Sequence, residues 1–210
     1  MVLAAAALPG CAVEQATALH PPAAAAVDVR ADTLAGVARR IYHQEAGGSV
    51  GHAAVKRIAR DHALLTALTS ANPAALRAAA LRQLFNPGKH VVRLSVTRDG
   101  RTLTNVGGAF VVAPAALNLR APGGAVLGRL EASMQDVVGY VKLVHRLTGV
   151  QIVVRGAAGH VETSLPAARA ASLPAKGNAA LAGRTYAVRS FSETGYDGER
   201  LTVWILSPRH

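Results

Sequence analysis

Two short segments of this 210-residue chain alternate apolar residues with arginine and hydroxyl residues. Arg93 and Ser95 take polar positions in the first alternation, and Arg129 and Ser133 do so in the second. Residues two apart on a strand share a face. A guanidinium beside a hydroxyl suits a carboxylate or another small anion, because charge-assisted hydrogen bonds hold it. The pattern therefore predicts an anion-binding face if these strands line a cavity, and an ordinary polar face if they meet water.

Tyr140 is a further candidate for the edge of such a pocket, with partly buried packing as its alternative role. Known catalytic patterns are absent from the sequence: it has no GxSxG elbow, no HExxH pair, no phosphate-binding P-loop and no dinucleotide fingerprint after a strand. His43 with Glu45, and His52 with His62, lack a zinc-binding spacing on one helix face. We therefore predict no catalytic residue, no metal ligand and no cofactor, and a protein that is not an enzyme.

The composition indicates a folded domain with a basic surface. Half of the residues are hydrophobic but only 4% are aromatic, so the core must be aliphatic, and the net charge is +11. A positive balance favours anionic partners such as lipid head groups or an acidic wall polymer. The basic residues are scattered, with no run longer than Arg39–Arg40. A solvated basic surface therefore remains the alternative, and nucleic acid is not an expected partner.

The first residues predict export. Residues 1–11 read MVLAAAALPGC, a short apolar run that ends at Cys11, the single cysteine. This segment resembles a bacterial lipobox, in which the cysteine is lipidated and becomes the mature N-terminus. An ordinary secretory signal, which would give a secreted protein, and an alanine-rich start without a targeting role are the alternatives. Residues 12–31 are rich in Ala and Pro and predict a flexible tether.

The sequence predicts helices in its first part and strands in its later part, and these elements must position the candidate residues. Periodic apolar residues predict helices over residues 32–45, 49–69 and 73–84, and from residue 90 the period changes to two. The strongest signal lies at residues 125–155, which predict a strand, a helix that begins after Asp136 and ends at Gly149, and a second strand. The order predicts an α+β fold, with the N-terminal helices packed on one antiparallel sheet that a single helix interrupts.

Further hairpins complete this predicted sheet. Asp99-Gly100 is a hairpin turn between two alternating segments. Residues 161–165 are expected to pair with 150–154, residues 166–178 to form a loop, and residues 184–191 and 201–206 to form a last hairpin. Trp204, the only tryptophan, is expected in the core. No apolar run of 18 residues follows residue 13, so the sequence predicts no membrane span beyond it.

Two stretches resemble bacterial Cache domains, the PAS-like extracytoplasmic sensing modules of receptors. They read GRLEASMQDVVGYVKLVHRLTGVQIVVRGAAGHVETS and GRTYAVRSFSETGYDGERLTVWIL. The likeness covers residues 32–207, which we predict to be a single sensory domain. It implies a PAS-like sheet, a ligand in the concave face of that sheet, and no catalysis.

The resemblance also implies a function. Cache domains commonly bind organic acids or amino acids, and they pass the signal to an output module across a membrane. Together with the lipobox-like start, it implies for this chain an extracytoplasmic, lipid-anchored binding domain for a small ligand such as an organic anion, with a separate membrane signalling partner. The alternative is an envelope lipoprotein whose basic surface binds polyanions or a membrane protein.

Overall fold

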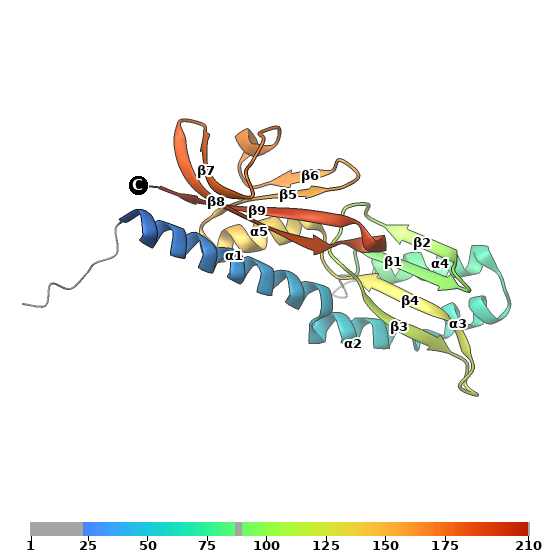
Figure 1. The fold of residues 1–210 in the computed structure, drawn as a ribbon. Helices are drawn as coiled ribbons and strands as arrows, with labels where there is room; N and C mark the ends of the chain where they lie inside the picture. Colours follow the sequence, from blue (N-terminus) through green and yellow to red (C-terminus); the bar gives the residue numbers. More distant parts are fainter. Residues whose placement is uncertain (1–22, 87–89, 210) are drawn as a thin grey trace, which may run out of the picture.

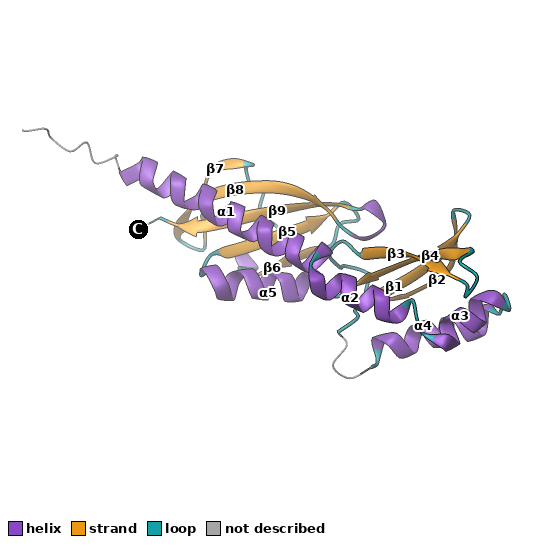
Figure 2. Ribbon diagram, turned by 90° about the horizontal axis from the view of Figure 1, so that it is seen from below, coloured by secondary structure: helices purple, strands orange, loops and turns teal. Residues whose placement is uncertain are grey.

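Two antiparallel sheets lie at opposite ends of an elongated molecule, and helices cover one face of each (Figures 1 and 2). The computed structural model describes residues 23–86 and 90–209. Helix α1 (Ala23–Gly47) lies along the five-stranded sheet, and α2 (Ser49–Ile58), α3 (His62–Thr69) and α4 (Pro73–Leu84) cover the four-stranded sheet. The predicted α+β class is confirmed. Cys11 lies outside the described residues.

The four helices begin and end where local chemistry requires. Helix α1 ends at Gly47, and the next residue is Gly48, where an added Cβ would lie 2.2 Å from the Gln44 carbonyl oxygen. The Asp61 carboxylate caps α3 by accepting from the Leu64 amide at 2.8 Å, and Asn72 caps α4 from the Ala75 amide at 3.0 Å. Capping at Asp61 divides the single helix predicted over residues 49–69 into α2 and α3.

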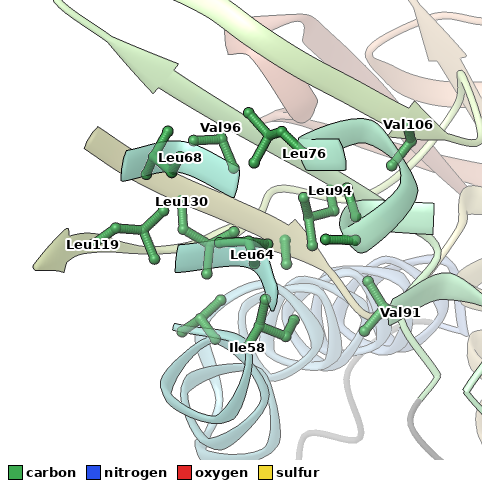
Figure 3. Packing of buried hydrophobic residues seen from close by; sticks show 14 of the residues in the cluster. Ile58, Leu64, Leu68, Leu76, Val91, Leu94, Val96, Val106, Leu119 and Leu130 are labelled. Carbon is green, nitrogen blue, oxygen red and sulfur yellow. The ribbon is translucent and has the colours of Figure 1, made fainter. Parts of the chain in front are cut away.

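The four-stranded sheet has the order β2-β1-β4-β3. Its strands are β1 (Arg93–Arg98), β2 (Arg101–Gly107), β3 (Ala115–Arg120) and β4 (Val126–Ser133). Asp99 and Gly100 both have positive φ, at 49° and 73°, so the predicted hairpin turn between β1 and β2 is confirmed. One face of the sheet packs against α2, α3 and α4 through aliphatic side chains that include Leu94, Leu130 and Leu64 (Figure 3).

The five-stranded sheet has the order β6-β5-β9-β8-β7. Its strands are β5 (Gln151–Gly156), β6 (Val161–Thr163), β7 (Lys176–Leu181), β8 (Arg184–Thr194) and β9 (Arg200–Pro208). Helices α1 and α5 (Val137–Thr148) bury one face of it. Across the other face a smaller apolar cluster includes Tyr186, Leu206 and the partly buried Trp204. A short 3-10 turn, η1 (Pro166–Ala168), lies within the segment that joins β6 to β7.

Three predictions require correction. The sequence predicted one sheet, but β4 pairs only with β1 and β3, and α5 carries the chain to the second sheet, where β5 pairs with β6 and β9. The strand–helix–strand unit at residues 125–155 therefore joins two sheets. Residues 23–31 belong to α1 and not to the tether, because alanine favours helix strongly. Strand β7 begins within the predicted loop.

The helix of the central unit agrees with its prediction. The Asp136 carboxylate accepts from the Gly139 amide at 2.6 Å, and Gly149 ends α5 with a left-handed φ of 70°. The hairpins β5–β6 and β8–β9 also form as predicted. Among residues 23–86 and 90–209, no helix combines the length and the apolar character that crossing a membrane requires.

Candidate functional site

Arg93 lies at the start of β1, on the face of the four-stranded sheet that the helices leave uncovered, and four groups surround its guanidinium. Its Nε donates to Asn105 Oδ1 at 3.0 Å and its Nη1 to the Ala109 carbonyl at 3.2 Å. Its Nη2 lies 3.2 Å from the Asp197 carboxylate, and its Cζ lies 4.3 Å from the centre of the Tyr196 ring. The arginine therefore already holds a carboxylate that the protein itself supplies.

Asp197 and Tyr196 come from the other end of the sequence. They belong to η2 (Tyr196–Gly198), the 3-10 turn between β8 and β9 of the five-stranded sheet. We call residues 195–198 the hairpin tip. The tip reaches onto the polar face of the four-stranded sheet, where the Tyr196 hydroxyl donates to Ser95 Oγ at 2.8 Å. Burial raises the pKa of Tyr196 to about 12, so the phenol stays neutral and remains a donor at physiological pH.

Asp197 is the accessible member of this group. Its side chain is 58% exposed, while that of Arg93 is 17% exposed. Asp197 also has a φ of 54°, in the left-handed region that aspartate tolerates better than most residues. The arginine is thus held in place by the protein, whereas its carboxylate partner lies at the surface.

Ser95 and Ser133 are both buried, and each hydroxyl has an internal partner. Ser133 lies opposite Arg93 in the β1–β4 pairing. Its hydroxyl donates to the Val112 carbonyl at 2.6 Å, in the segment that joins β2 to β3. The structure therefore brings Arg93, Ser95 and Ser133 together on one face, and it covers them with the hairpin tip and this joining segment.

Arg129 and Tyr140 lie elsewhere. Arg129 shares the polar face, but it sits opposite Thr97, farther along the sheet, and its Nε donates to Glu131 at 3.0 Å. It lines an open hollow of about 360 Å³ at that end, together with Arg98 and Asn118. Tyr140 is buried in α5 beneath the five-stranded sheet, where its hydroxyl donates to the Ala38 carbonyl at 3.0 Å. Burial raises its pKa, and it belongs to the core between α1, α5 and the five-stranded sheet.

A second contact ties Thr194, the residue just before the hairpin tip, to α1. The Tyr42 hydroxyl donates to the Thr194 carbonyl at 2.7 Å and accepts from the Ala113 amide at 3.2 Å. Gly195 forms an isolated bridge with Val112 beside it. The tip is therefore joined to the first helix, to the segment between β2 and β3, and to the polar face of the four-stranded sheet.

Sequence reasoning did not identify Tyr196, Asp197 or Asn105 as members of this site. The signal for the tip is the GYDG sequence, which by itself predicts only a turn. Asn105 offered a stronger signal, because it lies opposite Ser95 in the β1–β2 pairing and belongs to the same predicted hairpin. Within the described residues, no group of three or more histidine, cysteine, aspartate or glutamate side chains is placed to hold a metal ion.

Comparisons with known proteins find likeness only in structure. No family model matches the sequence, and no curated protein matches it. A structure of the periplasmic domain of Vibrio cholerae LuxQ superposes with a TM-score of 0.57 at 10% identity, covering 85% of this chain and 100% of that one. A second structure of the same domain gives 0.54, covering 85% and 98%.

The ligand-binding domain of the Pseudomonas fluorescens chemoreceptor CtaA, in complex with L-alanine, gives a TM-score of 0.35 at 11% identity over 89% of this chain and 95% of that one. The LuxQ comparison is consistent with the Cache-like, PAS-like fold that the sequence resembles. At 10% identity it concerns the fold alone.

Proposed function

We propose that this chain is an extracytoplasmic sensory domain that binds a small carboxylate or amino acid at Arg93, without catalysis. The observation that carries the proposal is the ion pair between Arg93 and Asp197. A well-ordered arginine faces an exposed carboxylate that belongs to the hairpin tip. A ligand carboxylate has the same chemistry as the Asp197 side chain, so it is able to replace that side chain on the guanidinium.

Such an exchange links binding to a change in structure. Asp197 and Tyr196 are adjacent, and both contact Arg93. A ligand that displaces Asp197 removes one of the attachments of the hairpin tip. The tip continues directly into β8 and β9, which lie beside α1. Ligand binding on the four-stranded sheet would therefore change the contacts of the hairpin tip, which is continuous with the five-stranded sheet and lies close to the first helix.

The chemistry of the described residues supports binding more than catalysis. In residues 23–86 and 90–209, no hydrogen bond joins a histidine ring to a serine or threonine side chain, a pairing that commonly activates a nucleophile. His145 contacts the Val150 carbonyl at 2.7 Å, and His52 contacts the Gly48 carbonyl at 3.1 Å. These two rings lie against the backbone beside their own helices.

The location and partner parts of the proposal rest on the N-terminal sequence and on the fold. We propose that lipidation of Cys11 holds the domain at a membrane, that residues 12–22 are the tether, and that residues 32–207 form one sensory domain. A membrane protein would then receive the signal. The likeness to a periplasmic domain supports the extracytoplasmic location.

Calorimetric titration with a panel of carboxylates and amino acids tests the ligand. We expect at least one compound to bind the wild-type chain, Arg93→Gln to abolish that binding, and Asp197→Asn to strengthen it several-fold by removing the internal competitor. Arg129→Gln is the matched control, because Arg129 is an arginine on the same face that pairs with Glu131. Binding that survives Arg93→Gln, or no binding to either the wild type or Asp197→Asn, would overturn the proposal.

A further inference from the structure

The two ends of the described chain leave the molecule from the same end. In both views α1 begins beside the end of β9, at the end of the five-stranded sheet that is remote from the four-stranded sheet (Figures 1 and 2). The strand pairing agrees, since Tyr186 lies opposite Pro208 and Gln151 lies opposite Leu206. The β7–β8 turn and the end of α5 therefore meet this same end.

Four arginines lie at this end of the molecule. Arg146 is exposed in the last turn of α5, Arg184 is exposed where β8 begins, and the half-buried Arg209 follows β9. Arg30 is exposed on α1. Asp32, the acidic residue that follows Arg30 in α1, is held by Arg189. We call the surface formed by Arg30, Arg146, Arg184 and Arg209 the basic end.

Two exposed apolar side chains accompany these arginines. Leu147 is 62% exposed beside Arg146, and Val29 is 65% exposed beside Arg30. Single exposed apolar residues need no explanation by themselves. Next to cations, however, they match the interface of a membrane, where apolar side chains enter the head-group layer and arginines contact phosphates.

A hollow at the basic end has the chemistry of an anion site. It measures about 680 Å³ and is lined by Gly183, Arg184, Thr185, Pro208 and Arg209. Two of these five residues carry guanidinium groups, which bind phosphate oxygens in a bidentate geometry. The hollow is open to solvent and lies between the β7–β8 turn and the end of β9, so a head group is able to enter it from outside.

We infer that the basic end docks on a surface of anionic phospholipid, with a lipid phosphate in this hollow on the exposed Arg184. This inference rests on the location part of the proposed function and is independent of the ligand at Arg93. An acyl chain on Cys11 would bring the start of α1 to the membrane, and the basic end is the surface that lies beside that start. A basic patch beside such an anchor adds electrostatic attraction to anionic lipids.

Vesicle co-sedimentation tests the inference with the full chain carrying Cys11→Ser, so that no lipid is attached. We expect binding to vesicles of phosphatidylcholine with 30 mol% phosphatidylglycerol, little binding to phosphatidylcholine alone, and weaker binding as salt rises. The double variant Arg146→Glu/Arg184→Glu should reduce binding at least about tenfold. The control Arg77→Glu/Arg82→Glu makes the same change in net charge at exposed positions of α4, beside the other sheet, and should stay within about twofold of the parent.

Three results would overturn the inference. They are no binding to the anionic vesicles, an equal loss in both double variants, and binding to heparin in solution that is as strong as binding to vesicles and depends on the same two arginines. The last result would identify a soluble polyanion as the partner instead. Titration of the carboxylate panel against Arg146→Glu/Arg184→Glu separates the two proposals, because ligand binding at Arg93 should be unchanged in this variant.

Discussion

At the scale of single residues, buried hydroxyls and one arginine join the two sheets. Tyr196 is almost fully buried, and its hydroxyl reaches Ser95 across a sequence separation of 101 residues. Arg93 lies against the same ring. A hydrogen bond between buried groups contributes modestly by itself, but the loss of one partner leaves the other unsatisfied and is more costly. These contacts are therefore sensitive to the removal of a single atom.

Tyr196→Phe removes the donor and keeps the ring. We expect the free energy of unfolding to fall by about 1–2 kcal/mol, because Ser95 Oγ loses a buried partner. Urea denaturation measures the change. Tyr186→Phe is the matched control in β8 and should change stability by less than about 0.5 kcal/mol. A double-mutant cycle with Ser95→Ala that shows no coupling would contradict this account of the hydroxyl.

Asp32→Asn should make stability depend less on pH. Hydrogen bonding from Arg189 lowers the pKa of Asp32 below its ordinary value of 3.8. A carboxyl with a lowered pKa stabilises the fold above the unfolded value, and this contribution is lost as pH falls through the folded pKa. The variant should therefore be less stable at pH 7, and the difference should vanish at the acid end. Thermal unfolding between pH 2.5 and 7 measures it.

A difference between wild type and Asp32→Asn that persists unchanged at the acid end would show that the charge of Asp32 is not its source. Salt gives a second check, because the Asp32 side chain is largely exposed. Screening in 1 M sodium chloride should shrink the difference at pH 7.

At the scale of elements, the helices follow local signals and the sheets do not. Asp61 shows how one side chain sets an element boundary. One of its carboxylate oxygens caps α3, and the other accepts from Gln83 of α4 at 2.9 Å. Asn72 performs only the capping task, for α4. The two caps are similar in geometry, so they form a natural comparison.

Asp61→Ala should therefore destabilise the protein more than Asn72→Ala. Loss of a cap costs about 1 kcal/mol, and Asp61→Ala also leaves the buried amide of Gln83 without this partner, which adds about 1 kcal/mol or more. Chemical denaturation of both variants measures the gap. Equal losses would show that the contact between Asp61 and Gln83 contributes little.

The sequence allowed prediction of those elements whose causes are local. Asp136, Gly149 and the Asp99-Gly100 turn act through residues only a few positions away. The helix bounds and the turn that they set were therefore predictable from the sequence. Partners of strands that no short hairpin joins were not predictable. The alternation in residues 126–133 shows that β4 has a buried face, but nothing local states that β4 pairs with β1 and β3 and not with β5.

The same reasoning explains how much of the site was predicted. Arg93, Ser95 and Ser133 share a face because alternation within a strand and pairing between neighbouring strands place them together. Tyr196 and Asp197 arrive from a hairpin about a hundred residues later, and no spacing in the sequence reports that contact. Tyr140 does not join these residues, because α5, the helix that carries it, packs against the five-stranded sheet.

At the scale of the whole molecule, two separate cores are joined by few contacts. One core lies between α2, α3, α4 and the four-stranded sheet, and the other lies between α1, α5 and the five-stranded sheet. The hairpin tip is a main link between them, through Arg93, Ser95 and the bridge of Gly195 to Val112. Motion between the two parts should therefore depend on this link.

Hydrogen exchange should reveal that dependence. Arg93→Gln removes the ion pair with Asp197 and weakens the contact with Tyr196, so amides of residues 109–113 and 195–198 should exchange faster. Amides at the centre of β5, such as Val153, should keep their protection because they lie in the other core. Exchange monitored by mass spectrometry measures both regions. Faster exchange throughout the chain, or no change at the tip, would contradict the role of this link.

The order of the elements has a consequence for how the chain is made. Residues 49–133 contain all of α2, α3, α4 and the four-stranded sheet, whereas the other part is built from α1 before them and from α5 to β9 after them. Asp32 of α1 meets Arg189 of β8 across 157 positions. During synthesis or export, which both start from the N-terminus, we expect the inserted part to assemble first. Helix α1 cannot pack against its sheet until strands β8 and β9, the last in the chain, are available.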